Sequence, residues 1–298
     1  MSVETQNEAH LGGPLRETAK VWTPEELPGV ELLSAYFLKQ NFNRHFHRRY
    51  AFGVIESGAL GFHYLGRSHV AAAGEINLVV PGEVHDGRAA AKSGWRYRMF
   101  YLEPGILTRA AGEITDKDSG PPFFRKGVIV DPQEARRLHS LHASLEKGTP
   151  SLLEIESELL LTLTGLISRH SENRPRPRPV GLERGPVDKA RAIIEDRYSE
   201  NISLSDLARE AGLSRFHFLR AFKDRLGLPP HAYQTIIRVG RARELIRRGQ
   251  SIADAAALSG FADQSHLNRH FKRTHGITPG QYRLATQAGR ARPERESY

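Results

Sequence analysis

The sequence predicts a two-domain protein: an N-terminal all-β barrel followed by a pair of helices, then a C-terminal all-α domain with two helix-turn-helix units joined by a long helix. Three observations support this fold class. Short β-favouring runs separated by glycine lie between Val30 and Pro104. One pattern of helix caps, turn glycine and apolar spacing occurs twice between Ile202 and Tyr282. The length of 298 residues fits two domains.

The repeated pattern organises the C-terminal third of the chain. Its second copy follows the first by about 48 residues before the turn glycine and by about 49 after it. The first copy contains Leu204, Asp206, Ala208, Gly212, Phe218, Arg220, Phe222, Gly227, Pro230 and Tyr233. The second contains Ile252, Asp254, Ala256, Gly260, Leu267, Arg269, Phe271, Gly276, Pro279 and Tyr282. The chain therefore carries one structural unit twice.

Each copy predicts a short helix, a tight turn with glycine and a second helix, which is the helix-turn-helix arrangement. In the first copy Ser203 or Ser205 caps the first helix, Gly212 ends it, and Ser214 caps the second. The matching residues of the second copy are Ser251, Gly260 and Asp263.

The second helix of each copy has a buried face, because Phe218 and Phe222, like Leu267 and Phe271, are spaced i, i+4. The intervening residues are expected to face outward, and they are of types that contact base edges and phosphates in a major groove. A single basic helix face is more often only solvated, but this one occurs twice. We predict a DNA-binding surface made of Ser214, Arg215, Phe216, Leu219, Arg220 and Lys223 in the first copy and Gln264, Ser265, Asn268, Arg269 and Lys272 in the second.

This segment resembles the DNA-binding domain of the AraC/XylS family of transcription regulators, most clearly in the run Gly276-Ile277-Thr278-Pro279 and the following Gln281-Tyr282-Arg283. The resemblance implies two helix-turn-helix units joined by a helix from about His231 to Arg248, entering successive major grooves of double-stranded promoter DNA. It also implies a homodimer and activation through contact with RNA polymerase. Leu219 stands where many members carry a polar residue, which favours reading of shape and thymine methyl groups by the first helix.

The composition limits the remaining functions. The chain has no cysteine, which excludes disulfides, thiolate metal sites and cysteine nucleophiles. The first twenty residues carry several charges and no apolar core, and no apolar run approaches a membrane span, so we expect a cytoplasmic protein without a membrane partner. Residues 186–298 carry a net charge of +8 (20 Lys and Arg against 12 Asp and Glu), whereas residues 1–170 carry −1 (19 against 20). This asymmetry suits phosphate binding at one end only.

Glycine- and proline-containing stretches divide the chain into five predicted segments. They are a flexible arm at 1–28, a sensor domain with dimerisation helices at 29–170, a Pro/Arg linker at 171–185, the double helix-turn-helix domain at 186–285 and a disordered tail at 286–298. Within the second segment the expected strands are Leu32–Phe37, Tyr50–Ile55, Leu60–Leu65, Ile76–Val80 and Arg96–Leu102.

Two histidine-containing stretches of the barrel, His45 with His47 and the Pro81-Gly82 turn that leads to His85, resemble the two motifs of the cupin barrel. In catalytic cupins a glutamate completes a metal site with these histidines. Here the expected positions hold Ala51 and Phe52, so we predict neither a metal nor another cofactor. Three histidines can bind a metal without it, and a metal remains the alternative.

We predict instead a pocket for a small-molecule effector at the barrel mouth. Strand alternation puts Trp95, Tyr97, Met99 and Tyr101 on one face. The candidate effector contacts are the polar groups His45, His47, His85 and Tyr97, with Trp95 as a stacking surface. The alternative is that Trp95 and Tyr97 belong to the core and the histidines to surface loops.

Two helices are expected after the barrel, one capped by Asp131 and running to about Lys147, and one beginning at Ser151. The second has a wide apolar stripe of Leu152, Leu153, Ile155, Leu159, Leu160, Leu163, Leu166 and Ile167. Family resemblance favours its use in dimerisation, and the alternative is burial within the domain.

The sequence thus predicts an effector-controlled, sequence-specific DNA-binding transcription regulator with no catalytic residues. One alternative is a metal-dependent cupin enzyme fused to a DNA-binding domain, against which the missing glutamate argues. Another is a sequence-tolerant architectural DNA binder.

Overall fold

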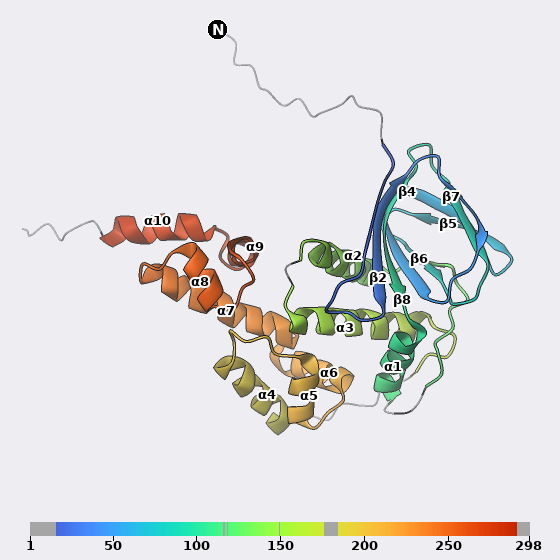
Figure 1. The fold of residues 1–298 in the computed structure, drawn as a ribbon. Coiled ribbons are helices and arrows are strands. Elements are labelled where there is room, and N and C mark those ends of the chain that lie inside the picture. The colour runs from blue at the N-terminus through green and yellow to red at the C-terminus, as the bar shows by residue number, and fades with distance from the viewer. Residues whose placement is uncertain (1–15, 116, 118, 149, 176–183, 291–298) are drawn as a thin grey trace, which may run out of the picture.

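The computed structural model describes residues 16–115, 117, 119–148, 150–175 and 184–290 (Figure 1). The N-terminal domain, residues 16–175, combines an antiparallel sheet with three helices, and the C-terminal domain, residues 184–290, is helical. Helix α3 (Leu152–His170) packs on α1 and α2 of its own domain and on α5, α6 and α7 of the other. The predicted fold class is confirmed. The predicted arm before residue 16 and most of the predicted linker lie outside the described residues.

The described part of the N-terminal domain contains one nine-stranded antiparallel sheet, in the order β1-β2-β8-β4-β6-β9, with β3, β5 and β7 pairing beside this path. The strands are β1 (Thr18–Trp22), β2 (Val30–Phe37), β3 (Asn41–His45), β4 (Tyr50–Tyr64), β5 (Arg67–Ala72), β6 (Ile76–Val79), β7 (His85–Ala89), β8 (Trp95–Leu102) and β9 (Val128–Ile129). Figure 1 shows the sheet curving round so that β5 and β7 face β2 and β8 across the domain. This curvature makes the barrel-like shape.

Strand β4 belongs to both layers of the curved sheet. Its first half pairs with β6 and β8, and its second half pairs with β5 and β7. The register shifts between Ile55 and Ser57, and Gly58 follows with φ of 72°. A Cβ at Gly58 would lie 1.9 Å from the carbonyl oxygen of Gly94, so only glycine fits this bend. The prediction of two separate strands here is wrong, because Gly58 bends a continuous strand instead of ending it.

Strand β1 lies within the segment that the sequence predicts to be a flexible arm. Residues 18–22 pair antiparallel with β2, with Thr18 opposite Tyr36, so the described part of residues 1–28 is not simply a flexible arm. The side chains of β1 are exposed or only partly buried, and an edge strand of this kind has no apolar alternation for the sequence to reveal.

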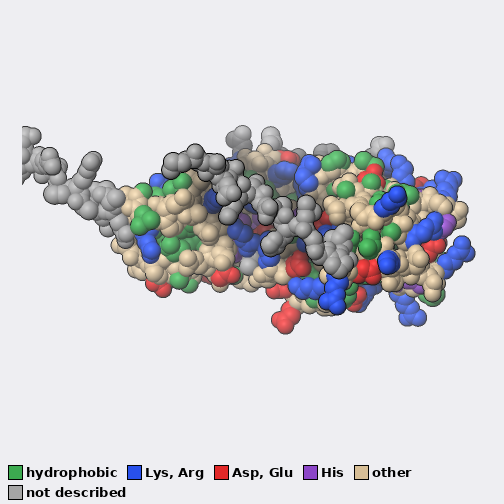
Figure 2. Space-filling view, turned by 90° about the horizontal axis from the view of Figure 1, so that it is seen from above, with side chains coloured by type: hydrophobic (Ala, Val, Ile, Leu, Met, Phe, Trp, Pro, Cys, Tyr) green, Lys and Arg blue, Asp and Glu red, His purple; other side chains and the backbone are tan. Residues whose placement is uncertain are grey.

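Charges of both signs are mixed on the N-terminal domain, which occupies the right half of Figure 2. This agrees with the net charge of −1 over residues 1–170. The helices of this domain are α1 (Pro104–Thr115), α2 (Pro132–Glu146) and α3. Asp131 caps α2 and Ser151 caps α3, as predicted, and α1 follows β8 after one residue.

The C-terminal domain contains α4 (Arg184–Asp196), α5 (Leu204–Ala211), α6 (Arg215–Leu226), α7 (Pro230–Arg247), α8 (Ile252–Leu258), α9 (Gln264–His275) and α10 (Pro279–Arg290). Helix α7 is the predicted long connecting helix. Helix α10 continues to Arg290, so the prediction of disorder from residue 286 is wrong for residues 286–290; the rest of the tail lies outside the described residues. None of the helices in the described ranges is long and apolar enough to cross a membrane.

The described residues form two hydrophobic cores, and the boundary between these cores does not coincide with the boundary between the two domains. The larger core runs through the sheet and α3 and continues into the first helix-turn-helix unit, where it includes Leu204, Leu207, Phe218 and Phe222. The smaller core belongs to the second unit and is built from Val239, Ala242, Ile246, Ala255, Ala256, Phe261, Leu267 and Phe271. The first unit is therefore packed as part of the N-terminal domain, whereas the second has a core of its own.

We predict that Asp131→Ala destabilises the N-terminal domain. Asp131 accepts a hydrogen bond from the Glu134 N–H (3.2 Å) and is paired with Arg169 (3.0 Å) and His170 (2.8 Å) of α3. Loss of the cap alone should cost about 1 kcal/mol, or roughly 2–4 °C in the Tm measured by calorimetry. Asp131→Asn is the matched control, because it keeps the capping acceptor and loses the charge.

The stabilisation that Asp131 contributes to the domain is expected to depend on pH. Burial opposes ionisation of Asp131, but the hydrogen bonds from His170, the Glu134 N–H and Arg169 prevail and lower its pKa to about 2. The stabilisation should therefore be complete above the ordinary pKa of 3.8 and decline as the pH falls toward 2. An Asp131→Ala protein as stable as the wild type at pH 7 would contradict both expectations.

Candidate nucleic-acid interface and effector pocket

Both predicted helix-turn-helix units form as α5-α6 and α8-α9, with the predicted caps in place. Ser203 and Ser251 accept hydrogen bonds at the start of α5 and α8, and Ser214 and Asp263 do so for α6 and α9. The turn glycine of the second unit, Gly260, has φ of 80°, and a Cβ there would lie 2.5 Å from the Ser199 carbonyl oxygen. Glycine is therefore required at this close approach.

The second unit presents the predicted surface. Leu267 and Phe271 of α9 are fully buried in the smaller core. The five predicted contact residues are all exposed: Gln264, Ser265, Asn268, Arg269 and Lys272. Helix α9 thus carries two amides and two cations on an open face, the chemistry that reads base edges and neutralises phosphates.

The first unit differs. Phe216 and Leu219 of α6 are 6% and 0% exposed, so the prediction that they face outward is wrong in this structure. Helices α1 and α3 of the N-terminal domain pack against α6, in addition to α4, α5 and α7 of its own domain. Ser214, Arg215 and Arg220 are partly buried, and Lys223 is exposed. The apolar character of Phe216 and Leu219 is the signal that the sequence offered for this packing.

Glu113 of α1 occupies the N-terminal end of α6. Its carboxylate pairs with the Arg215 guanidinium, with Nε 2.7 Å from one oxygen, and its other oxygen accepts from the Phe216 N–H at 3.2 Å. A helix N-terminus with an adjacent arginine is an anion-binding arrangement, the same one that a DNA phosphate uses. The carboxylate therefore stands where a phosphate oxygen would bind. No local sequence pattern predicts this contact, because it joins residues about one hundred positions apart.

Two further carboxylates of the N-terminal domain contact the C-terminal domain. Glu156 of α3 accepts from the Leu204 N–H at 2.6 Å, at the start of α5. Glu158 of α3 lies 3.4 Å from Nε2 of His231, at the start of α7. Burial raises the pKa of both Glu156 and Glu158. The interface is thus acidic on the α1 and α3 side and meets the basic domain at helix starts.

The three predicted histidines come together in the barrel. The ring centroids of His45 and His85 are 4.3 Å apart, and those of His47 and His85 are 4.8 Å apart. All three line one cavity of about 70 Å³, walled mainly by apolar residues. The cavity also contains Tyr97, as predicted, together with Phe42, Ala51, Leu60, Phe62, Asn77, Val79, Asp86, Gly87, Met99 and Tyr101.

Each histidine has the same tautomer. Nδ1 lies 2.8 Å from the Asn43 carbonyl oxygen in His45, 2.6 Å from that of Arg49 in His47 and 3.0 Å from that of Glu83 in His85. A carbonyl oxygen only accepts, so each Nδ1 carries a hydrogen, and Nε2 keeps a lone pair wherever the ring is neutral. Burial lowers the pKa of His47, and burial together with His47 and His45 lowers that of His85 to about 4. At neutral pH His47 and His85 are therefore hydrogen-bond acceptors.

Trp95 is misplaced in the sequence prediction. It is fully buried and packs on Phe37, Phe42 and Tyr97, outside the residues that line the cavity. Trp95 is therefore a core residue rather than a stacking surface, as in the alternative interpretation.

Three polar residues of the cavity, Tyr101, Asn77 and Asp86, were not predicted. Tyr101 lies edge-on to His47, with ring centroids 5.6 Å apart, and strand alternation had already put it on the Tyr97 face. Asn77 is 4% exposed, and its Oδ1 has no hydrogen-bond partner among the described residues. A polar side chain in the apolar strand Ile76–Val79 was the available signal.

Comparisons with known proteins also separate an N-terminal ligand-binding domain from a C-terminal helix-turn-helix domain. Residues 27–163 match the family model of the AraC-like ligand binding domain, and residues 207–285 match that of a helix-turn-helix domain. The chain is 32% identical over 239 residues to the HTH-type transcriptional regulator YbfI of Bacillus subtilis, covering 79% of this chain and 86% of that protein. It is 30% identical over 158 residues to the virulence regulon transcriptional activator VirF of Yersinia enterocolitica, covering 52% and 58%.

A solved structure, unsaturated fatty acid bound ToxT from Vibrio cholerae, is similar over 88% of this chain and 97% of that chain, with 16% identity and a TM-score of 0.39.

We predict that the His85 ring titrates near pH 4 in the folded protein, because its cavity disfavours the charged form. An NMR titration of the ring proton signals, assigned with His85→Asn, measures this midpoint. The urea-unfolded chain is the control and should titrate near the ordinary value of 6.5. Because the folded pKa is the lower one, His85 should make the fold less stable as the pH falls from about 6.5 to 4. A folded-state midpoint of 6 or more would contradict the acceptor role.

Proposed function

The chain belongs to the AraC family of transcription regulators, and from this premise we propose that a small molecule in the N-terminal cavity controls how its two helix-turn-helix units bind specific promoter DNA in the cytoplasm. The matched relatives are regulators, so the chain is a DNA-binding regulator with a ligand-binding domain and not an enzyme. The observation that carries the proposal is the contrast between the exposed face of α9 and the covered face of α6.

In this proposal the second unit reads DNA in the arrangement described here. Arg269 pairs with a guanine edge, Gln264 and Asn268 are suited to adenine, and Lys272 and Ser265 contact the backbone. The exposure of all five side chains supports these roles.

The first unit is proposed to be held back by the N-terminal domain. Glu113 competes with a DNA phosphate for Arg215 and for the start of α6. Ser214, Arg220 and Lys223 would join Arg215 on the DNA once α6 separates from α1. Phe216 and Leu219 would then supply apolar contacts to thymine methyl groups. Full-affinity binding therefore requires a change at the α1–α6 contact.

The effector is proposed to bind His45, His47 and His85 together with Tyr97, Tyr101 and Asn77. The neutral rings of His47 and His85 and the unpartnered Asn77 Oδ1 are acceptors, so the ligand should offer hydroxyl or N–H donors on a small, partly apolar body. A molecule with only acceptor groups would leave these atoms unpaired and bind weakly.

We extend the proposal to a homodimer and to activation through RNA polymerase, as the family resemblance implies. The apolar stripe of α3 is a poor candidate for the dimer contact, because Leu153, Leu159, Leu163 and Ile167 are already buried within the chain. A dimer would use another surface of the N-terminal domain.

The test of function begins with genome-wide mapping of binding sites, which supplies the operator. On that operator, Arg269→Ala should lose on the order of 1–3 kcal/mol of discrimination against random DNA, because a bidentate contact to guanine is lost. Lys272→Ala is the control and should weaken binding to operator and random DNA equally. Equal losses for Arg269→Ala would remove Arg269 from base reading, and uniform occupancy of the genome would favour an architectural binder.

Release of α6 gives a second test. Glu113→Ala should raise operator affinity of the effector-free protein about tenfold, since hydrogen bonds to a charged group contribute about 1.5–3 kcal/mol. Glu103→Ala removes the same charge from the N-terminal domain at a residue paired with Arg49 (3.9 Å), away from α6, and should leave the affinity unchanged. Unchanged or weaker binding by Glu113→Ala, measured by fluorescence anisotropy, would reject the competition.

A further inference from the structure

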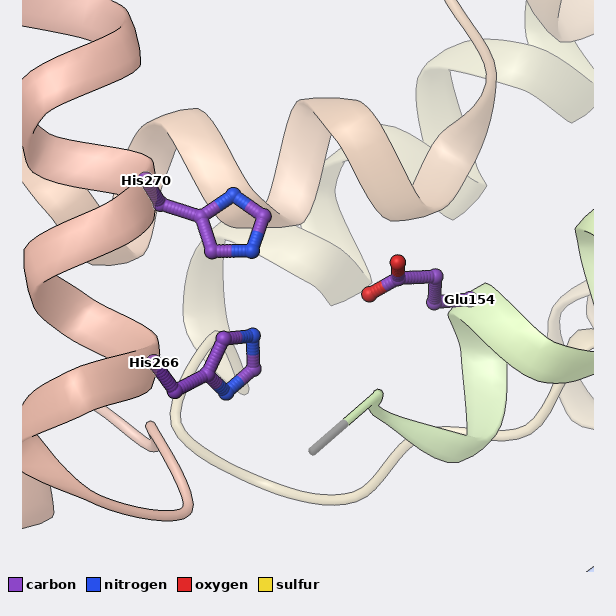
Figure 3. A group of neighbouring side chains, drawn as sticks. All are labelled: Glu154, His266 and His270. Carbon is purple, nitrogen blue, oxygen red and sulfur yellow. The ribbon is translucent and has the colours of Figure 1, made fainter. Parts of the chain in front are cut away.

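Three ligand-type side chains meet where the second helix-turn-helix unit contacts α3. His266 and His270 lie one turn apart on α9, and Glu154 lies in the first turn of α3. Figure 3 shows both imidazole rings on one side of α9, turned toward the Glu154 carboxylate. Their ligand atoms all lie within 4.8 Å of one another, and no other group of three such residues in the described ranges comes as close.

The placement of the two histidine rings suits metal binding better than a hydrogen bond between the rings. The ring centroids of His266 and His270 are 4.8 Å apart at an interplanar angle of 65°. Burial is the largest cause that lowers the pKa of both rings to about 4, so both are neutral and keep a lone pair at pH 7. His266 is 5% exposed, and its Nδ1 has no hydrogen-bond partner among the described residues. His266 matches His217 of the first copy at the offset of 49 residues, whereas Ala221 stands at the position of His270, so only His270 is particular to the second copy.

We propose that Glu154, His266 and His270 bind a divalent transition-metal ion of the zinc class, which joins α3 to the second recognition helix. Two imidazole nitrogens and one carboxylate oxygen form a known zinc ligand set, and water completes a tetrahedron. Ligand atoms of a tetrahedral zinc ion lie about 3.4 Å apart, so the side chains would close by about 1.5 Å.

The ion would not compete with DNA. His266 is buried and His270 is partly buried, and both rings contact Phe261, whereas Gln264, Asn268 and Arg269 are exposed on the same helix. Metal binding would therefore hold α9 to the N-terminal domain while its candidate reading face stays open. This inference does not depend on the DNA-binding proposal.

Zinc binding to the full-length protein tests it. Protein freed of metal by a chelator is dialysed against Zn²⁺, and the bound zinc is counted by elemental analysis. His270→Ala should bind one equivalent less than the wild type, and Glu154→Gln should bind that equivalent at least tenfold more weakly. His275→Ala, which removes an exposed histidine from the same helix, should bind as much as the wild type. Circular dichroism checks that each variant is folded.

The histidines of the effector cavity could bind zinc as well, so every variant is repeated with His47→Ala. In that background Co²⁺ should give the visible absorption of a tetrahedral site in the parent and in His275→Ala but not in His270→Ala. Zinc should also raise the Tm of the parent and not that of His270→Ala, because only a folded site gains from the ion. Equal zinc in the parent and His270→Ala, or equal loss in His275→Ala, would overturn the proposal.

Discussion

The contact between the Glu113 carboxylate and the start of α6 is the interaction on which the arrangement of the two domains depends. It joins an acidic side chain of the N-terminal domain to the helix start and arginine that an anion would otherwise use. Glu156 repeats the arrangement at the start of α5. Around these charged contacts, Phe216 and Leu219 are removed from water, so the electrostatic contacts fix the orientation and apolar burial supplies most of the free energy.

Helix α3 explains why the larger core crosses the domain boundary. Its apolar residues serve the sheet and α1 on one side and α5, α6 and α7 on the other, which is why its stripe is wider than a helix on one domain needs. The sequence showed this width, and a dimer contact was one reasonable interpretation. The structure gives the other, since the stripe is filled by the same chain.

Features that depend on neighbouring residues, such as helix caps, were predicted correctly from the sequence. Contacts between residues far apart in the chain were not. The caps Asp131, Ser151 and Asp263 were found from sequence, and Ser203 was one of two candidates for its helix, because a cap depends on residues three or four positions away. The convergence of His45, His47 and His85 came from a family pattern, whereas Asn77 in the same cavity required the fold. Glu113 lies in a stretch with no clear periodicity, and its partner lies in another domain. No pattern within either segment could have joined them.

The differences between the two copies match the differences in their surroundings. At the offset of 49 residues, Phe216 and Leu219 correspond to Ser265 and Asn268. The apolar pair lies against the N-terminal domain and the polar pair is in water. Against the N-terminal domain, Phe216 and Leu219 are buried and Arg215 pairs with Glu113. In the proposed DNA-bound state the same residues would meet thymine methyl groups and a phosphate. Helix α6 thus carries side chains that suit both a protein partner and a duplex, whereas Ser265 and Asn268 of α9 are polar and suit the duplex alone.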